Sequence, residues 1–319
     1  MDEIALAAPA KLNLGLRVLG RRPDGYHEIE SLLAPLDFGD SLHIRRCAGP
    51  GVALRLGGEA AQSVPAGREN LAWRAAQGFL EAAGLDFGVA LRLEKRIPAP
   101  GGLGGGSSDA GAVLRGLCAL APGRAGALRE LALSLGADVP FFLDPRPALV
   151  EGIGERIQPL DGLPALDVAI AHPRLPLATV AVYAALDAAP PPPRPPIRRL
   201  LERMGWAGPA ERAGQAGPGG AGPERWPLPE LLQNDLEAPA RRLCPAVAPL
   251  RKALEAAGAL AVGMSGSGPS VYGVFDSAAA ARAAARKLAA SGAWSRAART
   301  LSGPAGGESS QRGGRNAAE

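Results

Sequence analysis

A glycine-rich segment is the feature of this 319-residue sequence that points most directly to chemistry. Residues 98–108 are PAPGGLGGGSS, and five of the six residues from Gly101 to Gly106 are glycine. Glycine permits a positive φ and lets backbone N–H groups approach an anion closely. A helical pattern follows, and a helix N-terminus favours a phosphate through its unpaired N–H groups and its dipole. We therefore predict a phosphate-binding loop; a flexible glycine linker is the alternative.

The loop departs from the two commonest nucleotide-binding patterns. No Gly-Lys-Ser/Thr follows the glycines, as the Walker motif requires, and no acidic residue follows at the spacing of a dinucleotide-binding fold. Ser107 and Ser108 add hydroxyl groups at the start of the helix, and Ser108 is a candidate ligand for Mg²⁺. Pro100 removes one N–H donor from the loop.

Two charged residues far apart in the sequence are candidates for reacting groups. Asp138 precedes the apolar sequence VPFF and could act as a general base, although an N-cap or turn aspartate is equally compatible with the pattern. Lys11 lies on an alternating segment and shares a face with Asn13. It could stabilise charge on a transferred phosphate, and a solvated strand lysine is the alternative.

Aromatic and polar residues in turns form a further group. Tyr26 and His27 lie in a glycine-containing loop, where a ring can stack on a pyrimidine and an imidazole can contact its polar edge. A turn with incidental aromatic residues is the alternative. Residues 265–268 form a second Gly/Ser turn. Asn70 opens a predicted helix and Lys95 precedes the loop, so a helix cap and a surface lysine are their simplest interpretations.

Hydrophobic periodicity predicts the elements that must position these residues. Residues 11–19 alternate between apolar and polar or glycine, as in a half-buried strand. Further strands are predicted at 41–45, 52–56, 89–93, 168–171, 260–264 and 270–275. Helices are predicted at 69–83, from the glycine-rich loop to Pro122, and at 126–135, 179–186 and 277–290, and residues 229–257 are mostly helical.

Composition divides the chain into regions. We expect an N-terminal domain over residues 1–160 that binds ATP and a C-terminal domain over 161–300. Residues 188–227 are rich in Pro, Gly, Ala and Arg, which predicts a flexible insertion. Residues 301–319 contain almost no large apolar side chains, which predicts a disordered tail.

Bulk properties argue against several functional classes. Lys and Arg total 35 and Asp and Glu 31, and no basic block suggests a nucleic-acid partner. No apolar run approaches ~18 residues, so we expect no membrane partner. The three cysteines are far apart, which disfavours a disulfide framework or zinc site and favours a cytoplasmic location. We expect a monomer or weak homodimer.

Three segments together resemble the three motifs of the GHMP kinases, a family that includes galactokinase, homoserine kinase and mevalonate kinase. Residues 8–14 (APAKLNL) resemble the first motif, residues 98–110 the second and residues 264–270 (MSGSGPS) the third. Residues 22–28 (RPDGYHE), with shorter matches at 136–140, 152–155 and 234–237, are similar to a member that acts on a cytidine-diphosphate-linked methylerythritol. The resemblance extends from about residue 7 to 276, apart from the insertion.

The resemblance implies an α+β fold in two domains, the first like domain 2 of ribosomal protein S5 and the second ferredoxin-like, with the active site between them. It implies ATP and Mg²⁺ as cofactors, Lys11 and Asp138 as catalytic residues, and a cytosine site at Tyr26 and His27. The ATP-binding residues it implies are Asn70, Lys95, Pro98, Gly101, Gly102, Leu103, Gly104, Gly105, Gly106, Ser107 and Ser108. The other substrate-binding residues are Asn13, Thr179, Ser265 and Gly266, although Thr179 is also a plausible helix cap.

The activity implied is the ATP-dependent phosphorylation of the 2-hydroxyl of that cytidylated polyol in isoprenoid precursor synthesis. A homoserine or mevalonate kinase is the first alternative, and the sequence PDGYH argues against it because those enzymes need no cytosine site. A non-catalytic nucleotide-binding module is the second, and the joint presence of Lys11 and Asp138 argues against it.

Overall fold

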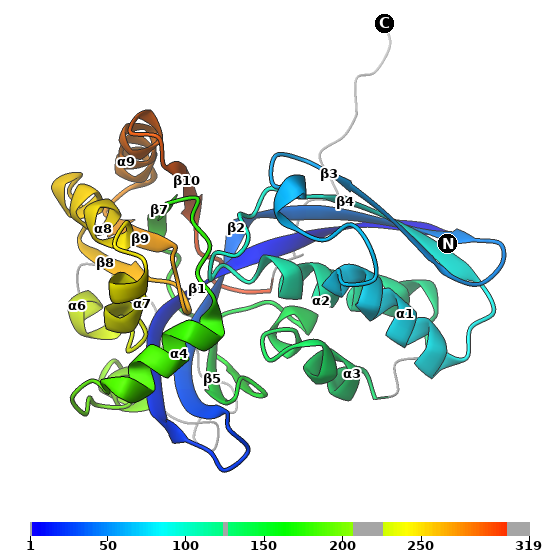
Figure 1. Cartoon of the computed structure of the whole chain (residues 1–319), viewed down its shortest axis with the longest axis horizontal. Helices are drawn as coiled ribbons and strands as arrows, with labels where there is room; N and C mark the ends of the chain where they lie inside the picture. The colour runs from blue at the N-terminus through cyan, green and yellow to red at the C-terminus, as the bar shows by residue number, and fades with distance from the viewer. Residues whose placement is uncertain (1, 124–126, 207–225, 305–319) are drawn as a thin grey trace, which may run out of the picture.

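The computed structural model describes residues 2–123, 127–206 and 226–304. Its strands form two sheets, each the centre of one lobe, and the long first strand crosses from one lobe towards the other (Figure 1). Within the described residues, no helix is long and apolar enough to cross a membrane.

The first sheet has six strands, and all neighbours are antiparallel except β3 and β4. The strands are β1 (Glu3–Arg21), β2 (His27–Cys47), β3 (Val52–Gly57), β4 (Gly88–Glu94), β5 (Ala148–Gly152) and β6 (Arg156–Pro159). Helices α1 (Leu71–Ala83), α2 (Gly105–Leu120) and α3 (Leu128–Leu135) cover one face (Figure 1). The apolar stripe of α2 is buried against β1, which places the start of that helix near the middle of the strand.

The second sheet is antiparallel, in the order β10-β7-β9-β8. Its strands are β7 (Asp167–His172), β8 (Ala261–Met264), β9 (Val271–Phe275) and β10 (Trp294–Arg299). The helices of this half are α4 (Thr179–Ala188), α5 (Ile197–Arg203), α6 (Leu228–Leu231), α7 (Glu237–Leu243), α8 (Val247–Ala256) and α9 (Ala278–Ala290). Both α8 and α9 pack against the sheet, the arrangement of a ferredoxin-like layer.

β1 is not half-buried as its alternation predicts, because both of its faces are covered between Ala8 and Arg17. The polar side chains of Lys11 and Asn13 are only 3% and 5% exposed. The register between β1 and β2 shifts between Pro9 and Lys11 and again between Asn13 and Gly15. Such bulges re-aim side chains, and here they flank the two polar residues of the first motif.

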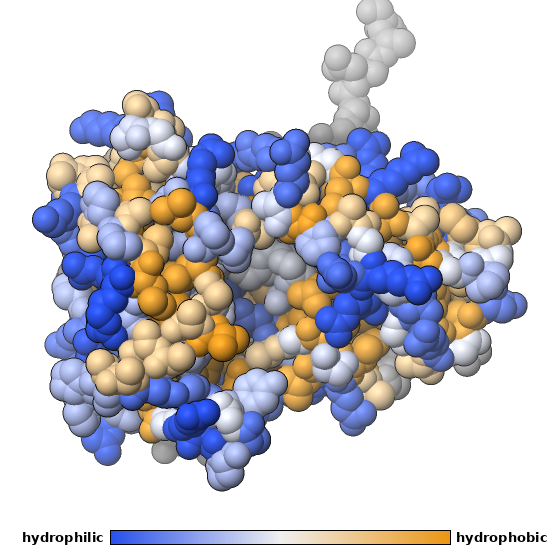
Figure 2. Space-filling view, viewed as in Figure 1, coloured by the Kyte–Doolittle hydropathy of each residue, from blue (hydrophilic) through white to orange (hydrophobic). Residues whose placement is uncertain are grey.

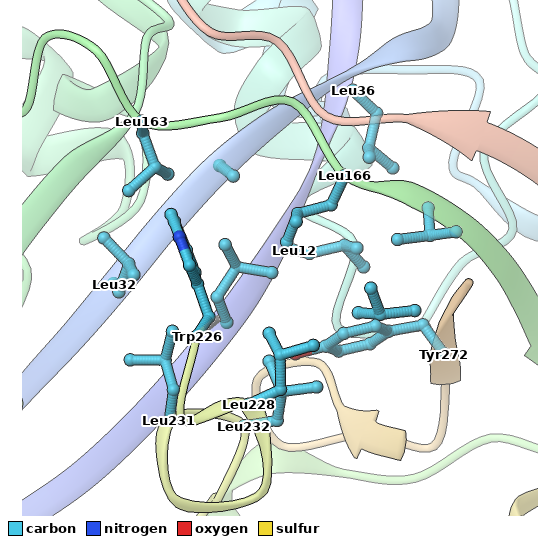
Figure 3. Packing of buried hydrophobic residues seen from close by; sticks show 14 of the residues in the cluster. Leu12, Leu32, Leu36, Leu163, Leu166, Trp226, Leu228, Leu231, Leu232 and Tyr272 are labelled. Atoms are coloured by element: carbon cyan, nitrogen blue, oxygen red, sulfur yellow. The ribbon is translucent and has the colours of Figure 1, made fainter. Parts of the chain in front are cut away.

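One apolar core joins the two sheets. Leu12 from β1, Leu36 from β2 and Tyr272 from β9 belong to the same buried cluster, with α6 residues such as Leu231 closing one side (Figure 3). The hydroxyl of Tyr272 donates to the carbonyl of Asn13 at 2.8 Å, so its polar end is satisfied within the cluster. Burial of this size opposes relative movement of the lobes at this point, because separation would expose the cluster to water.

The segment predicted to be a flexible insertion, residues 188–227, is packed into the protein at both of its described ends. Ile197–Arg203 forms α5, and the buried carboxylate of Glu30 accepts hydrogen bonds from the first backbone N–H groups of that helix. Trp206 and Trp226 pack edge to face at 5.6 Å and are buried in the shared core. Composition misled here because a few large apolar residues are enough to anchor a Pro-rich segment. Residues 207–225 lie outside the described residues, as do residues 305–319 of the predicted tail.

Candidate active site

The three motif segments meet where the two lobes join. The backbone N–H of Lys11 donates to the carbonyl of Leu103 at 3.0 Å, which connects the first motif to the glycine-rich loop. The Oγ of Ser265, in the turn after β8, donates to the carbonyl of Gly102 at 2.8 Å. The same hydroxyl accepts from the backbone N–H of Asn13 at 3.2 Å. The face of the molecule in Figure 2 is hollowed between the two lobes.

Lys11 and Asp138 lie together at this junction. The Nζ of Lys11 is 3.6 Å from the Oδ2 of Asp138 and donates to the Oδ1 of Asn13 at 2.5 Å. The Nδ2 of Asn13 donates to the Oγ of Ser31 at 2.8 Å, which fixes the orientation of the amide. The side chain of Lys11 is 4% exposed and that of Asp138 is 41% exposed. The cation is therefore held within the protein, and the carboxylate is open to a ligand.

Close packing of α2 brings Asp138 to this position. Asp138 precedes a short 3-10 helix, Pro140–Leu143, and this helix lies directly on α2. A Cβ at Gly111 would lie only 2.5 Å from the Cβ of Phe142, so glycine is required for this approach. The 3-10 helix begins after Val139 and has no side-chain cap, so Asp138 is not its N-cap.

The glycine-rich loop has the geometry of an anion cradle. Gly102 and Gly104 have φ of +72° and +73°, a region that residues with a Cβ rarely adopt. A Cβ at Gly102 would also lie 2.1 Å from the carbonyl oxygen of Ser265. Gly104 is the N-cap of α2 and no side chain caps the helix. The first N–H groups of α2 are thus not occupied by a capping side chain, which leaves them for a phosphate.

The other predicted loop residues differ in their position and exposure. Gly105, Gly106, Ser107 and Ser108 form the first turn of α2. Leu103 is 1% exposed and anchors the loop in the shared core. Gly101 is buried, while Pro98 is partly exposed at the start of the loop.

Tyr26 and His27 lie at the turn between β1 and β2, beside α4. Tyr26 is 60% exposed. The ring of His27 stacks on Tyr183 with centroids 4.7 Å apart, and its Nε2 is 2.7 Å from the Oδ1 of Asp187. Burial, and then the negative charge of Asp138, raise the pKa of Tyr183 to about 12. Tyr183 is therefore a neutral aromatic side chain that stacks on His27 and lies within range of the charge of Asp138.

Sequence reasoning did not single out Tyr183 or Asp187. With Thr179 they occur at intervals of four along α4, so the three side chains share one face of the helix. Thr179 Oγ1 lies 2.8 Å from Ser267 Oγ in the third-motif turn. The helical spacing was a readable signal, but only the fold shows that this face points towards the β1–β2 turn.

Asn234 supports the third motif. Its Nδ2 donates to the carbonyls of Met264 and Gly266, at 2.8 and 2.7 Å. Ser265 is completely buried. A Cβ at Gly266 would lie 3.4 Å from the Nζ of Lys11, so the turn lies directly against the ammonium of Lys11. The predicted substrate residues Ser265 and Gly266 therefore border the site.

Lys95 does not have the position expected of a nucleotide contact. Its side chain is completely buried, and its Nζ lies 2.5 Å from Asp40 Oδ2 and 2.6 Å from Asp109 Oδ2. Although burial opposes the charge, the carboxylates of Asp109 and Asp40 raise the pKa of Lys95. Burial raises the pKa of Asp109 well above its ordinary value. The buried triad lies beneath the start of α2, and the Lys95 ammonium is shielded from solvent and paired with two carboxylates.

Asn70 is also used by the protein itself. Its Oδ1 accepts from the N–H of Ala72 as the N-cap of α1, and its Nδ2 donates to the carbonyl of Pro65. The side-chain cap that the sequence allowed is thus the observed role. With both ends of the amide engaged, Asn70 positions α1 beside the glycine-rich loop.

A metal site made by the protein alone is absent from the described residues, where no three His, Cys, Asp or Glu side chains cluster suitably. The Oγ of Ser108 is buried and has no hydrogen-bond partner. A buried hydroxyl without a partner is unusual. Its place in the first turn of α2 fits an oxygen ligand for a cation that arrives with a triphosphate.

Comparison with known proteins identifies the class. The family model described as "GHMP kinases N terminal domain" matches residues 70–144, which include the glycine-rich loop and Asp138. The model described as "GHMP kinases C terminal" matches residues 227–293, which include the third motif. These matches and the two-lobed α+β architecture confirm the fold class expected from the motifs.

Relatives over almost the whole length make the assignment more specific. A 4-diphosphocytidyl-2-C-methyl-D-erythritol kinase of Citrifermentans bemidjiense is 38% identical, over 92% of this chain and 97% of that protein. One from Thermus thermophilus is 43% identical, over 90% of this chain and 94% of the relative. The chain belongs to the family of 4-diphosphocytidyl-2-C-methyl-D-erythritol kinases.

Solved structures agree with this. A crystal structure of 4-(cytidine 5'-diphospho)-2C-methyl-D-erythritol kinase matches with a TM-score of 0.73 and 40% identity, over 93% of this chain and 99% of the other. Homoserine kinase from Cytophaga hutchinsonii matches with a TM-score of 0.67 but 19% identity. It covers 95% of this chain and 96% of the other, and at that identity it supports the fold alone.

Proposed function

We propose that this protein transfers the γ-phosphate of ATP to the 2-hydroxyl of 4-diphosphocytidyl-2-C-methyl-D-erythritol, giving the 2-phosphate and ADP for isoprenoid precursor synthesis by the non-mevalonate route. The single observation that carries the proposal is the juxtaposition of Lys11 and Asp138, 3.6 Å apart, at the end of an anion-binding loop. The relatives named for this activity, at 37–43% identity over most of their length, support the same acceptor.

In the proposed reaction Asp138 accepts the proton. As the O–H bond of the acceptor breaks, its oxygen forms a bond to the γ-phosphorus, and the bond from that phosphorus to the β-phosphate oxygen breaks to release ADP. The exposed carboxylate of Asp138 can reach a hydroxyl, whereas the buried ammonium of Lys11 stabilises charge on the transferred phosphoryl group. The N–H groups at the start of α2 hold the phosphates.

In this proposal Mg²⁺ binds together with ATP. Phosphate oxygens and water provide most of the ligands that this small cation prefers, so a dedicated protein cage is not required. Ser108 is the side chain that we propose as an additional ligand, because its buried hydroxyl has no partner within the protein. The cation would spread the negative charge of the triphosphate during transfer.

The acceptor is proposed to lie between β1 and α4. Tyr26 and Tyr183 offer aromatic surfaces for a cytosine ring, and His27 offers a polar edge held by Asp187. Asn13, which contacts Lys11, and Thr179, which contacts Ser267 in the third-motif turn, are the polar side chains that we assign to the polyol. The three free cysteines are compatible with a cytoplasmic enzyme.

A coupled assay with purified protein tests the proposal. We expect ADP release with ATP and 4-diphosphocytidyl-2-C-methyl-D-erythritol, and phosphorus NMR should show a new phosphomonoester on the acceptor. Homoserine and mevalonate serve as competing acceptors and should give turnover at least ~10³-fold lower, because neither fills the aromatic turn. Preferred phosphorylation of homoserine or mevalonate would contradict the acceptor assignment, and no turnover with any acceptor would contradict the kinase itself.

A further inference from the structure

Three carbonyl groups of the glycine-rich loop are bound by donors from the surrounding protein. The carbonyl of Leu103 accepts from the backbone N–H of Lys11, and that of Gly102 accepts from Ser265 Oγ. The carbonyl of Pro100 accepts from the Nε2 of His172 at 2.9 Å. In a trans peptide the N–H points away from the C=O of the same unit, so a donor that fixes the carbonyl also fixes the direction of the N–H. These donors thus set the direction in which the loop presents its amides.

His172 is the only donor of the three that is an imidazole, and its protonation state is determined by its contacts. It is the last residue of β7 and is 3% exposed. Its Nδ1 accepts from the backbone N–H of Arg174 at 2.8 Å. An Nδ1 that accepts cannot carry a proton, so the proton is on Nε2, where it is donated to Pro100. Burial lowers the pKa of His172, which agrees with a neutral ring.

The imidazole also forms part of the surface on which the loop lies. A Cβ at Gly101 would lie 3.3 Å from the Cδ2 of His172 and 2.8 Å from the carbonyl oxygen of Pro98. The loop backbone is therefore in direct packing contact with the ring. A change in the position of His172 would be transmitted to Gly101 as well as to Pro100.

We propose that His172 is a positioning residue for the ATP-binding loop, acting as a neutral Nε2–H donor that connects the second sheet to the peptide of Pro100. The inference rests on the proposed function, because it assigns the loop to ATP. His172 touches neither the reacting atoms nor the acceptor site. Its loss should therefore weaken ATP binding selectively, leaving the affinity for the cytidylated acceptor unchanged.

Two amide replacements provide the sharpest test. In His172→Gln the side-chain amide can occupy the place of Nε2 and donate to Pro100, whereas the shorter His172→Asn cannot reach that far. Removing one hydrogen bond of about 1 kcal/mol corresponds to a change of about fivefold in an equilibrium constant. We expect His172→Asn to raise KM for ATP, and Kd for a non-hydrolysable ATP analogue, by about fivefold. His172→Gln should restore most of that loss.

Matched measurements separate positioning from stability alone. Val168→Ala, on the same strand and equally buried, should lower the thermal midpoint without changing KM for ATP. KM for the acceptor should change less than about twofold in all three variants. Equal ATP affinity in His172→Asn and His172→Gln, or a parallel rise in both KM values, would overturn the inference.

The experiments distinguish a failure of the inference about His172 from a failure of the proposed function. If the wild-type protein binds the ATP analogue but does not phosphorylate the cytidylated acceptor, the acceptor assignment fails, and the binding comparison still decides the role of His172. If the wild-type protein is active and the variants bind ATP as well as it does, only the inference about His172 fails. A wild-type protein that bound no nucleotide would overturn both.

Discussion

The ammonium of Lys11 lies 3.6 Å from the carboxylate of Asp138, although the two residues belong to different elements of the first lobe and are distant in the sequence. Lys11 is held on β1 by the amide of Asn13, and Asp138 is brought in by the packing of Phe142 on Gly111. Their exposures differ tenfold, 4% against 41%. This asymmetry supports the roles proposed above, in which the buried cation stabilises charge and the accessible carboxylate receives a proton.

Replacement of the carboxylate should affect the chemical step. Asp138→Asn keeps the size of the side chain but cannot accept the proton, so kcat should fall by about 10²–10⁴-fold. Because the side chain is half exposed, the thermal midpoint should change little. Asp144→Asn, at an exposed surface ion pair with Arg146, is the matched control and should retain full activity. Steady-state kinetics would decide, and near wild-type kcat in Asp138→Asn would remove Asp138 from the mechanism.

The backbone of the phosphate loop should not tolerate a side chain at Gly102. In Gly102→Ala the new Cβ meets the carbonyl of Ser265 at 2.1 Å, and φ of +72° is unfavourable for alanine. The loop must shift, and we expect the affinity for ATP to fall by about 5–150-fold, since strain at such a position costs about 1–3 kcal/mol. Gly20→Ala is the control, because no atom lies within 4 Å of its added Cβ. Calorimetric titration with an ATP analogue measures the affinity of both variants. Unchanged affinity in Gly102→Ala would argue against the loop as the ATP site.

The aromatic ring of Tyr183 should contribute to the binding of the acceptor and not to the binding of ATP. Loss of stacking on one base costs about 1–3 kcal/mol, so Tyr183→Leu should raise KM for the cytidylated acceptor by about 5–150-fold. Tyr183→Phe retains the ring and should remain within about threefold of wild type. Measuring both KM values tests this, because an increase in KM for ATP instead would place the ring in the nucleotide site.

Lys95 should be a structural residue. Lys95→Met leaves Asp40 and Asp109 buried without their cation, and loss of one partner from a buried ion pair costs about 3–5 kcal/mol. Urea unfolding should show this loss. Asp109→Asn, which removes one of the two carboxylates and leaves the Lys95–Asp40 pair, should be much less destabilising. If Lys95→Met were as stable as wild type but had weak ATP binding, the lysine would be a ligand contact after all.

The stability of the protein should depend on the protonation of His172. Burial, together with the charge of Arg174, lowers the pKa of His172 in the folded state below the ordinary value of about 6.5. Above pH ~6.5 the ring is neutral in both states; as the pH falls through that value the unfolded state binds the proton first, so stability decreases. His172→Gln removes this contribution. The difference in unfolding free energy between wild type and His172→Gln should therefore shrink from pH 7.5 to 5.5, and a constant difference would contradict the prediction.

Much of the site could be predicted from the residues themselves. The glycines of residues 101–106 predicted an anion-binding loop because glycine adopts a positive φ readily and lets the backbone approach an anion closely. The alternation around Lys11 and Asn13 placed both on one face of a strand. The same alternation suggested that this face is exposed, and it is not, because the second lobe and the loop cover it. Local periodicity reports which residues share a face but not what packs against it.

The amino-acid sequence by itself determined the local geometry of this protein: the strand at Lys11, the loop at residues 101–108 and the helix that follows are set by side-chain periodicity and glycine. Only the tertiary structure decided which charged groups are available for chemistry. Lys11 lies within the first motif and Lys95 just before the second, yet two buried carboxylates neutralise Lys95, whereas Lys11 meets one accessible carboxylate. The physical reason is that the electrostatic role of a lysine depends on its neighbours in space, and these come from segments that the chain brings together only by burying its apolar core.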